Sequence, residues 1–498
     1  MKIIFITDSK ATFDSVKLLE SNTRASLRQS GHKITEVMSG TQSQDNWRNL
    51  LRSNDVIIGT DTEMLNARKK YNIPIPTLIP SYGLGTRGLL IFREFRRLLR
   101  KGDSFFCPSS ADLASANQLI KNESINTYLL PYSLPPMYKI GKRRRHNLKK
   151  NRYTSLAYIG RINQQKNIHI LLKMVRELLN RGFLIKLFIV GSEDSSNCPE
   201  LNLNNKEYFQ HLDKLINRYS LQNNVKMLGG LPPSRVINLL SNINIHVSCS
   251  TFRTEDFGFV PIEAMATGVP TIGTNWGGFL DTIEHGITGY RMPVHITKNG
   301  FRVNWKAGVN YIVKLITDKN LYSTLSGNCV SIAETKYTHE LFSHRLNSIL
   351  QKLAHRNDNT KISDLYSLID QDALDYLTDI DNNLKKNKDG LSARNGLFYK
   401  KSRIFRFFSK YAPDRLPLWH AKSKIYIPLD IEIYNNHVIV EDFNWGKTIP
   451  ITPIEYKVLH LINGILSING IAQKMKLSNN KVIKILDSLF YKGLILPE

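Results

Sequence analysis

The sequence predicts two Rossmann-like α/β domains that face a cleft, followed by a small C-terminal domain. Residues 1–150 alternate short apolar runs with helical stretches, which is typical of a parallel sheet with crossover helices. A second series of the same kind follows over 151–355. Residues 424–498 contain short alternating runs and then three helical patterns, after a polar linker at 356–423. We therefore expect three folded domains.

Composition limits the class of protein. The 498 residues are 42% hydrophobic, enough for roughly three domains of about 150 residues. The formal net charge of +26 favours anionic partners such as nucleotide phosphates, membrane surfaces, nucleic acids or acidic peptides. The four cysteines form no CxxC pair and there is no apolar run of about eighteen residues, and the opening residues MKIIFITDS lack the features expected of a signal peptide. We expect a soluble cytoplasmic protein.

The first domain is expected to contain five or more strands, at 2–7, 56–60, 77–79, 104–107 and 127–130. Residues 91–101 form an amphipathic, arginine-rich helical pattern. We interpret it as an ordinary domain helix, with docking on an anionic membrane as the alternative. The basic run at 139–152 has no aromatic residue to stack a base, so a solvated linker is favoured over a nucleic-acid site.

The second domain opens with a strand at 156–159 that stops at Gly160. Arg161 and Lys166 follow on a short polar loop, before a helix with apolar residues at the helical period. Two cations at the carboxyl end of a parallel strand can neutralise both phosphates of a diphosphate, because ligands bind at that edge of the sheet. The pattern predicts a diphosphate site.

Two carboxylates, Glu255 and Glu263, stand eight residues apart in TEDFGFVPIEAMATG. Pro261 suits the first helical turn, so we expect a helix over 262–267 that Gly268 ends, with Glu263 in its first turn. Glu255 would lie on the preceding loop, where Gly258 lets backbone amides approach a ligand. Carboxylates can each hold a pair of sugar hydroxyls while the helix end faces a phosphate.

These motifs, together with GVPTIGTNWGGFLDTIEHGITGY at 268–290, resemble the retaining nucleotide-sugar glycosyltransferases of family 4. That family's signature is a glutamate, seven residues and a second glutamate. The resemblance covers roughly 1–355 and is strongest over 155–290. It departs at 8–15, where a paired-glycine loop is usual, and at 77–88, where Ser81 and Tyr82 stand in place of an expected histidine.

The resemblance implies the GT-B fold and assigns roles to the motif residues. Arg161 and Lys166, with Gly160 beside them, would bind the donor diphosphate. Glu255 and the amides of Phe257 and Gly258 would contact the donor sugar, and Glu263 would hold the ribose. The catalytic group is therefore Glu255, Arg161 and Lys166. No metal and no cofactor beyond the nucleotide sugar is expected.

The tail predicts a winged helix: a strand over 424–433, a turn at 435–436, a returning strand, three helices and a last strand. It resembles both DNA-binding winged helices and the peptide-binding domain of the pyrroloquinoline-quinone peptide chaperone. The third helix has lysines but no arginine, which favours a peptide over DNA. A structural appendage is the alternative. The Asp379-Ile380-Asp381 motif lies in a polar run and is not expected to bind metal.

The predicted function is transfer of a hexose from a nucleotide-diphosphate donor, with retention and without metal, to a peptide or protein acceptor recruited by residues 424–498. Three alternatives stay open. The acceptor could be lipid-linked or a polysaccharide at the inner face of the membrane. The protein could be a sugar-nucleotide epimerase of the same fold, or a DNA-binding regulator.

Overall fold

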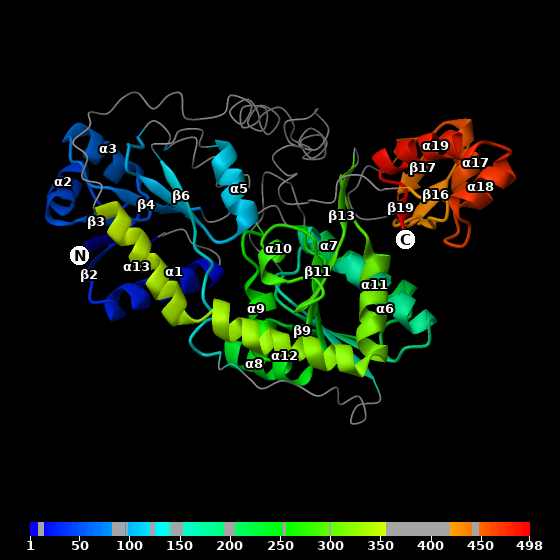
Figure 1. Ribbon diagram of the computed structural model, residues 1–498, viewed down its shortest axis with the longest axis horizontal. Helices are drawn as coiled ribbons and strands as arrows, with labels where there is room; N and C mark the ends of the chain where they lie inside the picture. Colours follow the sequence, from blue (N-terminus) through cyan, green and yellow to red (C-terminus); the bar gives the residue numbers. More distant parts are fainter. Residues whose placement is uncertain are drawn as a thin grey trace.

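The computed structural model describes residues 1–7, 14–81, 95, 98–119, 125–138, 140, 153–193, 205–251, 255–297, 300–354, 419–440 and 448–498. Two sheet domains lie side by side, and the C-terminal unit lies beyond the second domain (Figure 1). Residues 8–13, Tyr82, most of 139–152, and 355–418 with Asp379 and Asp381 lie outside the described part, so the predictions made there are not addressed.

The first domain is a parallel six-stranded sheet in the order β2-β1-β3-β4-β5-β6. The five predicted strands are confirmed. The strands are β1 (Lys2–Thr7), β2 (Lys33–Met38), β3 (Val56–Ile58), β4 (Thr77–Pro80), β5 (Ser104–Cys107) and β6 (Asn126–Leu129). The helices are α1 (Asp14–Gln29), α2 (Gln44–Ser53), α3 (Thr62–Lys70) and α5 (Ser110–Leu119).

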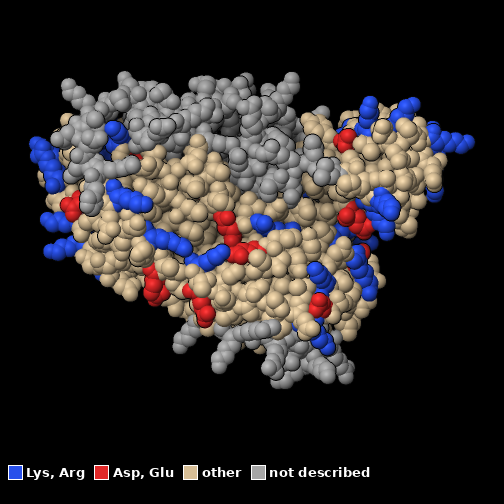
Figure 2. All heavy atoms as spheres, viewed as in Figure 1, with Lys and Arg blue, Asp and Glu red and all other residues tan. Residues whose placement is uncertain are grey.

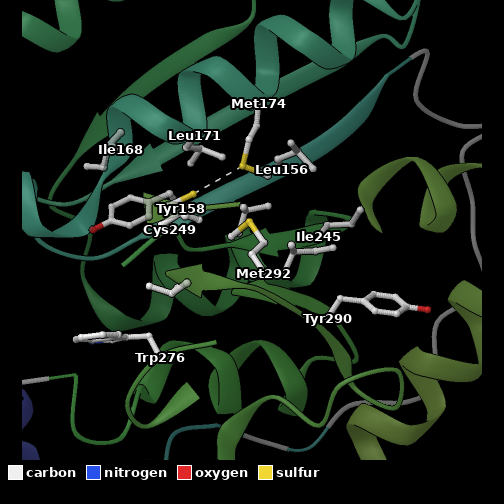
Figure 3. Packing of buried hydrophobic residues seen from close by; sticks show 14 of the residues in the cluster. Leu156, Tyr158, Ile168, Leu171, Met174, Ile245, Cys249, Trp276, Tyr290 and Met292 are labelled. Carbon is white, nitrogen blue, oxygen red and sulfur yellow. Dashed lines mark hydrogen bonds between the residues drawn. The ribbon is translucent and has the colours of Figure 1, made fainter. Parts of the chain in front are cut away.

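The second domain is a parallel sheet in the order β12-β11-β10-β7-β8-β9. Its strands are β7 (Thr154–Ile159), β8 (Ile185–Val190), β9 (Val225–Gly229), β10 (Ile245–Val247), β11 (Thr271–Thr274) and β12 (Gly289–Met292). Its helices are α6 (Ile168–Asn180), α7 (Asn205–Arg218), α8 (Pro233–Asn242), α9 (Phe259–Ala266), α10 (Phe279–Thr282), α11 (Trp305–Thr317) and α12 (Lys319–Lys336). Met174 of α6 packs on the sheet, 3.7 Å from the Cys249 sulfur (Figure 3). Two Rossmann-like domains are thereby confirmed.

The last helix of the second domain, α13 (His339–Ala354), returns to the first domain. Ser343 is hydrogen-bonded to Ser26 of α1, and Asn347 bonds His32 and Ser30 at 2.7 and 2.6 Å. Helix α13 therefore joins the end of the second domain to α1 and the residues that follow it in the first.

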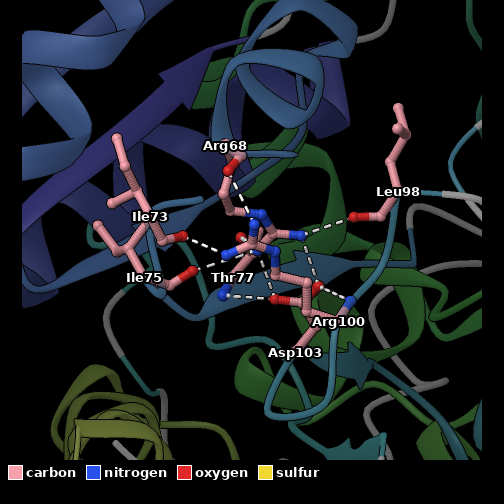
Figure 4. Close-up of polar contacts among 7 residues, drawn as sticks. All are labelled: Arg68, Ile73, Ile75, Thr77, Leu98, Arg100 and Asp103. Atoms are coloured by element: carbon pink, nitrogen blue, oxygen red, sulfur yellow. Dashed lines mark hydrogen bonds and ion pairs between the residues drawn. The ribbon is translucent and has the colours of Figure 1, made fainter. Parts of the chain in front are cut away.

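A buried ion pair, Arg68 with Asp103, connects α3 to the segment before β5 in the first domain (Figure 4). The two terminal nitrogens of Arg68 each donate to an oxygen of Asp103 at 2.7 Å, and they also reach Thr77 and the Leu98 carbonyl. Arg100 donates to the carbonyls of Arg68 and Ile73. The cluster joins α3, β4 and the segment before β5.

The described part of the 91–101 stretch packs into this domain. Phe95 and Leu99 are buried, and Arg100 is occupied by the carbonyl contacts just described. These residues are packed into the domain, and both the domain-helix and the membrane-docking interpretations of 91–101 stay predictions. No helix among the described residues is both long and apolar enough to cross a bilayer.

The C-terminal unit has its own apolar core. It contains α17 (Pro453–Leu461), α18 (Ile468–Met475) and α19 (Asn479–Tyr491), the pair β15 (Ile425–Tyr426) and β19 (Leu496–Pro497), and the antiparallel sheet β16 (Ile431–Ile433), β17 (His437–Val440) and β18 (Thr448–Pro450). The single strand predicted over 424–433 is wrong. Two short strands replace it, since Pro428 between them has no N–H to donate to a ladder. The winged-helix assignment stays a prediction.

Candidate active site

The cationic loop begins where β7 ends. The Gly160 N–H donates to the Val190 carbonyl at 2.9 Å, and the chain then leaves the sheet at Arg161. Lys166 closes a short 3₁₀ turn over Gln164–Lys166, which Asn163 caps by accepting from the Lys166 N–H. Both cations therefore lie at the carboxyl edge of the second sheet, where ligands of open parallel sheets bind.

Asn167 fixes this loop to the neighbouring strand. Its backbone is left-handed, with φ of 53°, and its side chain donates to the Cys249 carbonyl and to the Thr251 hydroxyl at 2.9 and 2.8 Å. The Thr251 N–H donates in turn to the Gln165 carbonyl at 3.1 Å. The cationic loop is thus held to the segment that leads from β10 to Glu255.

Lys166 and Glu255 form an ion pair at 2.5 Å, and the Ser250 hydroxyl donates to the same carboxylate at 2.6 Å. Burial raises the pKa of Glu255, but Lys166, Ser250 and Arg161 outweigh it, so its pKa lies below the usual value. Glu255 is therefore ionised at neutral pH. Three of the predicted residues, Arg161, Lys166 and Glu255, are brought together.

The segment 255–258, which we call the carboxylate loop, rests on the glycine turn at 275–278. The Gly278 N–H donates to the Glu255 carbonyl at 2.6 Å. A Cβ at Gly277 would lie 2.3 Å from that carbonyl oxygen, and a Cβ at Gly278 would lie 2.4 Å from Phe257. Only glycine allows this approach, so the two glycines let the turn contact the backbone of the carboxylate loop directly.

Helix α9 begins earlier than predicted. It starts at Phe259 rather than 262, because Gly258 adopts a left-handed conformation, with φ of 85°, at the N-cap. Pro261 is the third helical residue, where its missing N–H still has no intrahelical partner to lose. Glu263 consequently lies in the second turn, and its predicted place in the first turn is wrong.

Glu263 has a partner that the sequence did not reveal. Its carboxyl is hydrogen-bonded to Tyr138, which lies on the connector between the two domains. Burial raises the pKa of Glu263 to about 7, and the Tyr138 bond opposes that rise. No local sequence signal links Tyr138 to a residue more than a hundred positions away.

Asp256 is a second residue that sequence analysis missed. Burial, Asp112 and Glu255 raise its pKa to about 8, while the Phe257 N–H donates to it. The Phe257 amide, predicted to contact a sugar, is thus bonded within the loop in the free protein. The Phe257 ring lies in the core, 5.1 Å from the Tyr132 ring.

The first domain contributes groups to the same place. Asp112, in the first turn of α5, is hydrogen-bonded to Ser81. Its negative charge raises the pKa of Asp256. Ser110 of α5 donates through its hydroxyl to Asp281 of α10 at 2.7 Å, and Figure 1 shows these helices facing each other. The candidate site therefore lies where the two domains meet.

Comparison with known families is consistent with this geometry. Residues 139–328 match the family model described as glycosyl transferases group 1. The chain is 31% identical over 195 residues to the capsular polysaccharide biosynthesis glycosyltransferase CapM of Staphylococcus aureus, a match that covers 39% of this chain and 45% of CapM. It is 28% identical over 208 residues to human alpha-1,3/1,6-mannosyltransferase ALG2, covering 40% and 45% of the two chains. The chain thus spans about half the length of these relatives.

Solved structures give the fold class. Anabaena HepE in complex with UDP superimposes with a TM-score of 0.53 at 16% identity, over 71% of this chain and all of HepE. A sucrose-phosphate synthase from Thermosynechococcus elongatus gives 0.53 at 15%, over 71% and 99%. The fold is of the GT-B type, as predicted.

Proposed function

We propose that this protein is a retaining, metal-independent glycosyltransferase that moves a hexose from a nucleotide-diphosphate donor. The observation that carries the proposal is the ion pair of Lys166 with Glu255, beside Arg161, at the sheet edge facing the first domain. The family match over 139–328 and relatives that transfer sugars support it. Because neighbours of this fold bind UDP and UDP-glucose, uridine nucleotides are the first donors to test.

Arg161 and Lys166 would provide most of the rate acceleration. As the glycosidic bond breaks, the electron pair stays on the leaving diphosphate, and its negative charge grows. Arg161 and Lys166 would stabilise that charge in the transition state more than in the bound donor, which accelerates the step. A bound diphosphate would also compete with Glu255 for Lys166. That competition would free the Glu255 carboxylate to accept hydrogen bonds from the hydroxyls of the sugar.

The proposal for the acceptor concerns the C-terminal unit. We propose that a peptide or protein acceptor binds there by adding a strand to β16, which is an edge strand of its three-stranded sheet among the described residues. Amide hydrogen exchange tests this directly. Addition of an acceptor peptide should protect amides of 431–433, whereas unchanged exchange with every peptide that accepts sugar would refute this role.

The donor proposal is tested by a panel of nucleotide sugars. Thermal stabilisation by one donor, followed by product analysis with candidate peptide, lipid-linked and polysaccharide acceptors, should give a glycosylated product that keeps the anomeric configuration. Isomerised or hydrolysed donor without acceptor would favour the epimerase alternative. Salt-dependent binding of duplex DNA without any nucleotide-sugar effect would favour the regulator.

A further inference from the structure

The C-terminal unit is docked on the second domain by buried polar contacts. The contact surface is the hairpin of β13 (Val294–Thr297) and β14 (Gly300–Val303), which follows β12. Figure 1 shows this hairpin beside the C-terminal unit. An appendage held only by a linker would not need such contacts, so they indicate a fixed interface.

Arg302 is the centre of the contact. Its side chain is 3% exposed, and its Nε donates to the Gly493 carbonyl at 2.8 Å. Gly493 itself has a φ of 72°, and a Cβ there would lie 2.5 Å from the Thr297 hydroxyl oxygen. The ring of His295 meets the ring of Phe490 at 5.2 Å. The hairpin and the C-terminal unit are therefore in direct van der Waals contact.

Further bonds surround this centre. Tyr426 donates to the Asn304 side chain at 2.9 Å, and Asn304 donates to the Pro497 carbonyl at 2.9 Å. Trp305 donates to the Pro428 carbonyl at 3.1 Å. Tyr219, directly after α7, donates to Asp430 at 2.6 Å. Within the C-terminal unit the contacts involve residues 426–430 and 490–497. Within the second domain they come from the hairpin, the start of α11 and the residue after α7. Contacts from three separate segments hold the unit in one orientation.

The same hairpin leads to the carboxylate loop. Phe301, next to Arg302, packs its ring 4.5 Å from the ring of Trp276, which is fully buried. Trp276 belongs to the glycine turn, whose Gly278 donates to the Glu255 carbonyl. A continuous series of contacts thus runs from Gly493 through the hairpin and Trp276 to Glu255.

We propose that Phe301 and Arg302 are positioning residues: docking of the C-terminal unit holds the hairpin against Trp276 and so fixes the glycine turn beneath Glu255. The C-terminal unit is then part of the structure of the active site, in addition to any acceptor it binds. This inference concerns the free protein and does not rest on the identity of the donor or acceptor.

Hydrogen exchange measured by mass spectrometry on the full chain tests the proposal. Two sets of amides are followed together: the glycine turn, through Asn275 and Gly278, and the C-terminal unit, through β17 and α19. In Arg302→Ala, both sets should exchange at least about tenfold faster, because the buried charge-assisted bond is lost. Arg302→Lys keeps the charge and should recover part of the protection of both.

Phe301→Leu separates the two halves of the series. It keeps an apolar side chain beneath Trp276 but removes the ring contact, so the glycine turn should exchange several-fold faster while the C-terminal unit keeps its protection. Arg181→Ala is the matched control. That arginine bonds Glu177 and Asn310 within the second domain, and both amide sets should stay within about twofold of the parent.

The decisive result is the behaviour of the glycine turn when the C-terminal unit loosens. If the C-terminal unit exchanges faster in Arg302→Ala while the turn stays within about twofold of the parent, the proposal is wrong. If Arg302→Ala loses all protection because it fails to fold, Tyr426→Phe replaces it. That variant removes one hydroxyl from the C-terminal unit, and the same comparison of unit and turn then decides the question.

Discussion

Two cation–carboxylate pairs in this protein differ in a way that separates structure from function. Arg68 and Asp103 are 0% and 1% exposed, and the Arg68 nitrogens also reach Thr77 and a backbone carbonyl (Figure 4). Lys166 and Glu255 are 15% and 11% exposed, at the sheet edge between the domains. The first pair is enclosed by the fold, and the second stays within reach of a ligand.

The difference shows that an ion pair alone does not mark a site. Its surroundings do: a pair enclosed in the core of a domain serves the fold, whereas a pair at the carboxyl edge of a parallel sheet lies where ligands of such sheets bind. The charged groups on the face shown in Figure 2 are spread over both domains and the C-terminal unit, so charge density there does not single out the pair either. Variants of both pairs, of Glu263 and of the docking contact test this difference.

The largest expected effect is on stability. Arg68→Met leaves Asp103 buried without its cation, which should lower the free energy of unfolding by about 3–5 kcal/mol. Urea denaturation measures the loss. The double variant Arg68→Met/Asp103→Leu should recover part of it, since the unpaired carboxylate is removed while the N–H groups of Thr77 and Arg100 lose their acceptor. An unstable double variant would mean that packing, rather than charge, makes the cluster important.

The second prediction concerns catalysis. Lys166→Ala and Arg161→Ala should each slow sugar transfer about 10²–10³-fold, as expected when one donor to a growing anion is removed. The free energy of unfolding should change by less than about 1 kcal/mol for the half-exposed Arg161. Lys336→Ala, which removes a surface partner of Glu284, is the control and should keep full activity.

The third prediction uses the raised pKa of Glu263. In the unfolded chain this carboxyl titrates near 4.5, and in the folded protein near 7, so between these values the folded state binds more protons. Its contribution to stability is complete below about pH 4.5 and is lost as the pH rises through 7. Because the side chain is half-buried, the change should be about 1–2 kcal/mol.

Glu263→Gln removes this titration, so its stability should vary less with pH than that of the parent. Denaturant midpoints at pH 5 and pH 8 give the comparison. Glu284→Gln, at a surface ion pair with Lys336, should leave the parent's pH dependence intact. Parallel curves for parent and Glu263→Gln would show that the pKa of Glu263 is not raised.

The fourth prediction concerns the docking contact between the hairpin and the C-terminal unit. Gly493→Ala introduces both a strained backbone and a methyl group 2.5 Å from the Thr297 hydroxyl, so it should cost about 1–3 kcal/mol. Gly182→Ala is matched, with φ of 84° and nothing within 4 Å of the new methyl group. It should cost only the strain, about 1 kcal/mol. If thermal melts show that Gly493→Ala and Gly182→Ala lose equal stability, the close contact of Gly493 with Thr297 contributes nothing to stability.

Sequence reasoning is most successful where local pattern decides structure. The parallel strands and the strand-to-loop position of Arg161 follow from short-range periodicity and turn chemistry. The predicted start of α9 is wrong because it gives Pro261 more weight than Gly258. A left-handed glycine N-cap is compatible with a proline three residues further on.

Tertiary contacts account for the rest. Tyr138 beside Glu263, Asp112 beside Asp256, and Arg302 beside Gly493 are each joined across long stretches of chain, and no spacing rule predicts such pairs. The sequence predicts a C-terminal domain behind a linker, without its docking, for the same reason. Its polar contacts with the hairpin depend on two surfaces that only the folded chain brings together.

The central claim is that Arg161 and Lys166 hold the diphosphate of a sugar donor. Calorimetric titration of UDP, GDP, ADP and dTDP into the parent, Arg161→Ala and Lys166→Ala tests it most directly. We predict that at least one of these nucleotides binds the parent and that each variant weakens that binding at least about tenfold, the effect of losing one charge-assisted contact. Binding of equal affinity in all three proteins would contradict the account, as would a parent that binds none of them.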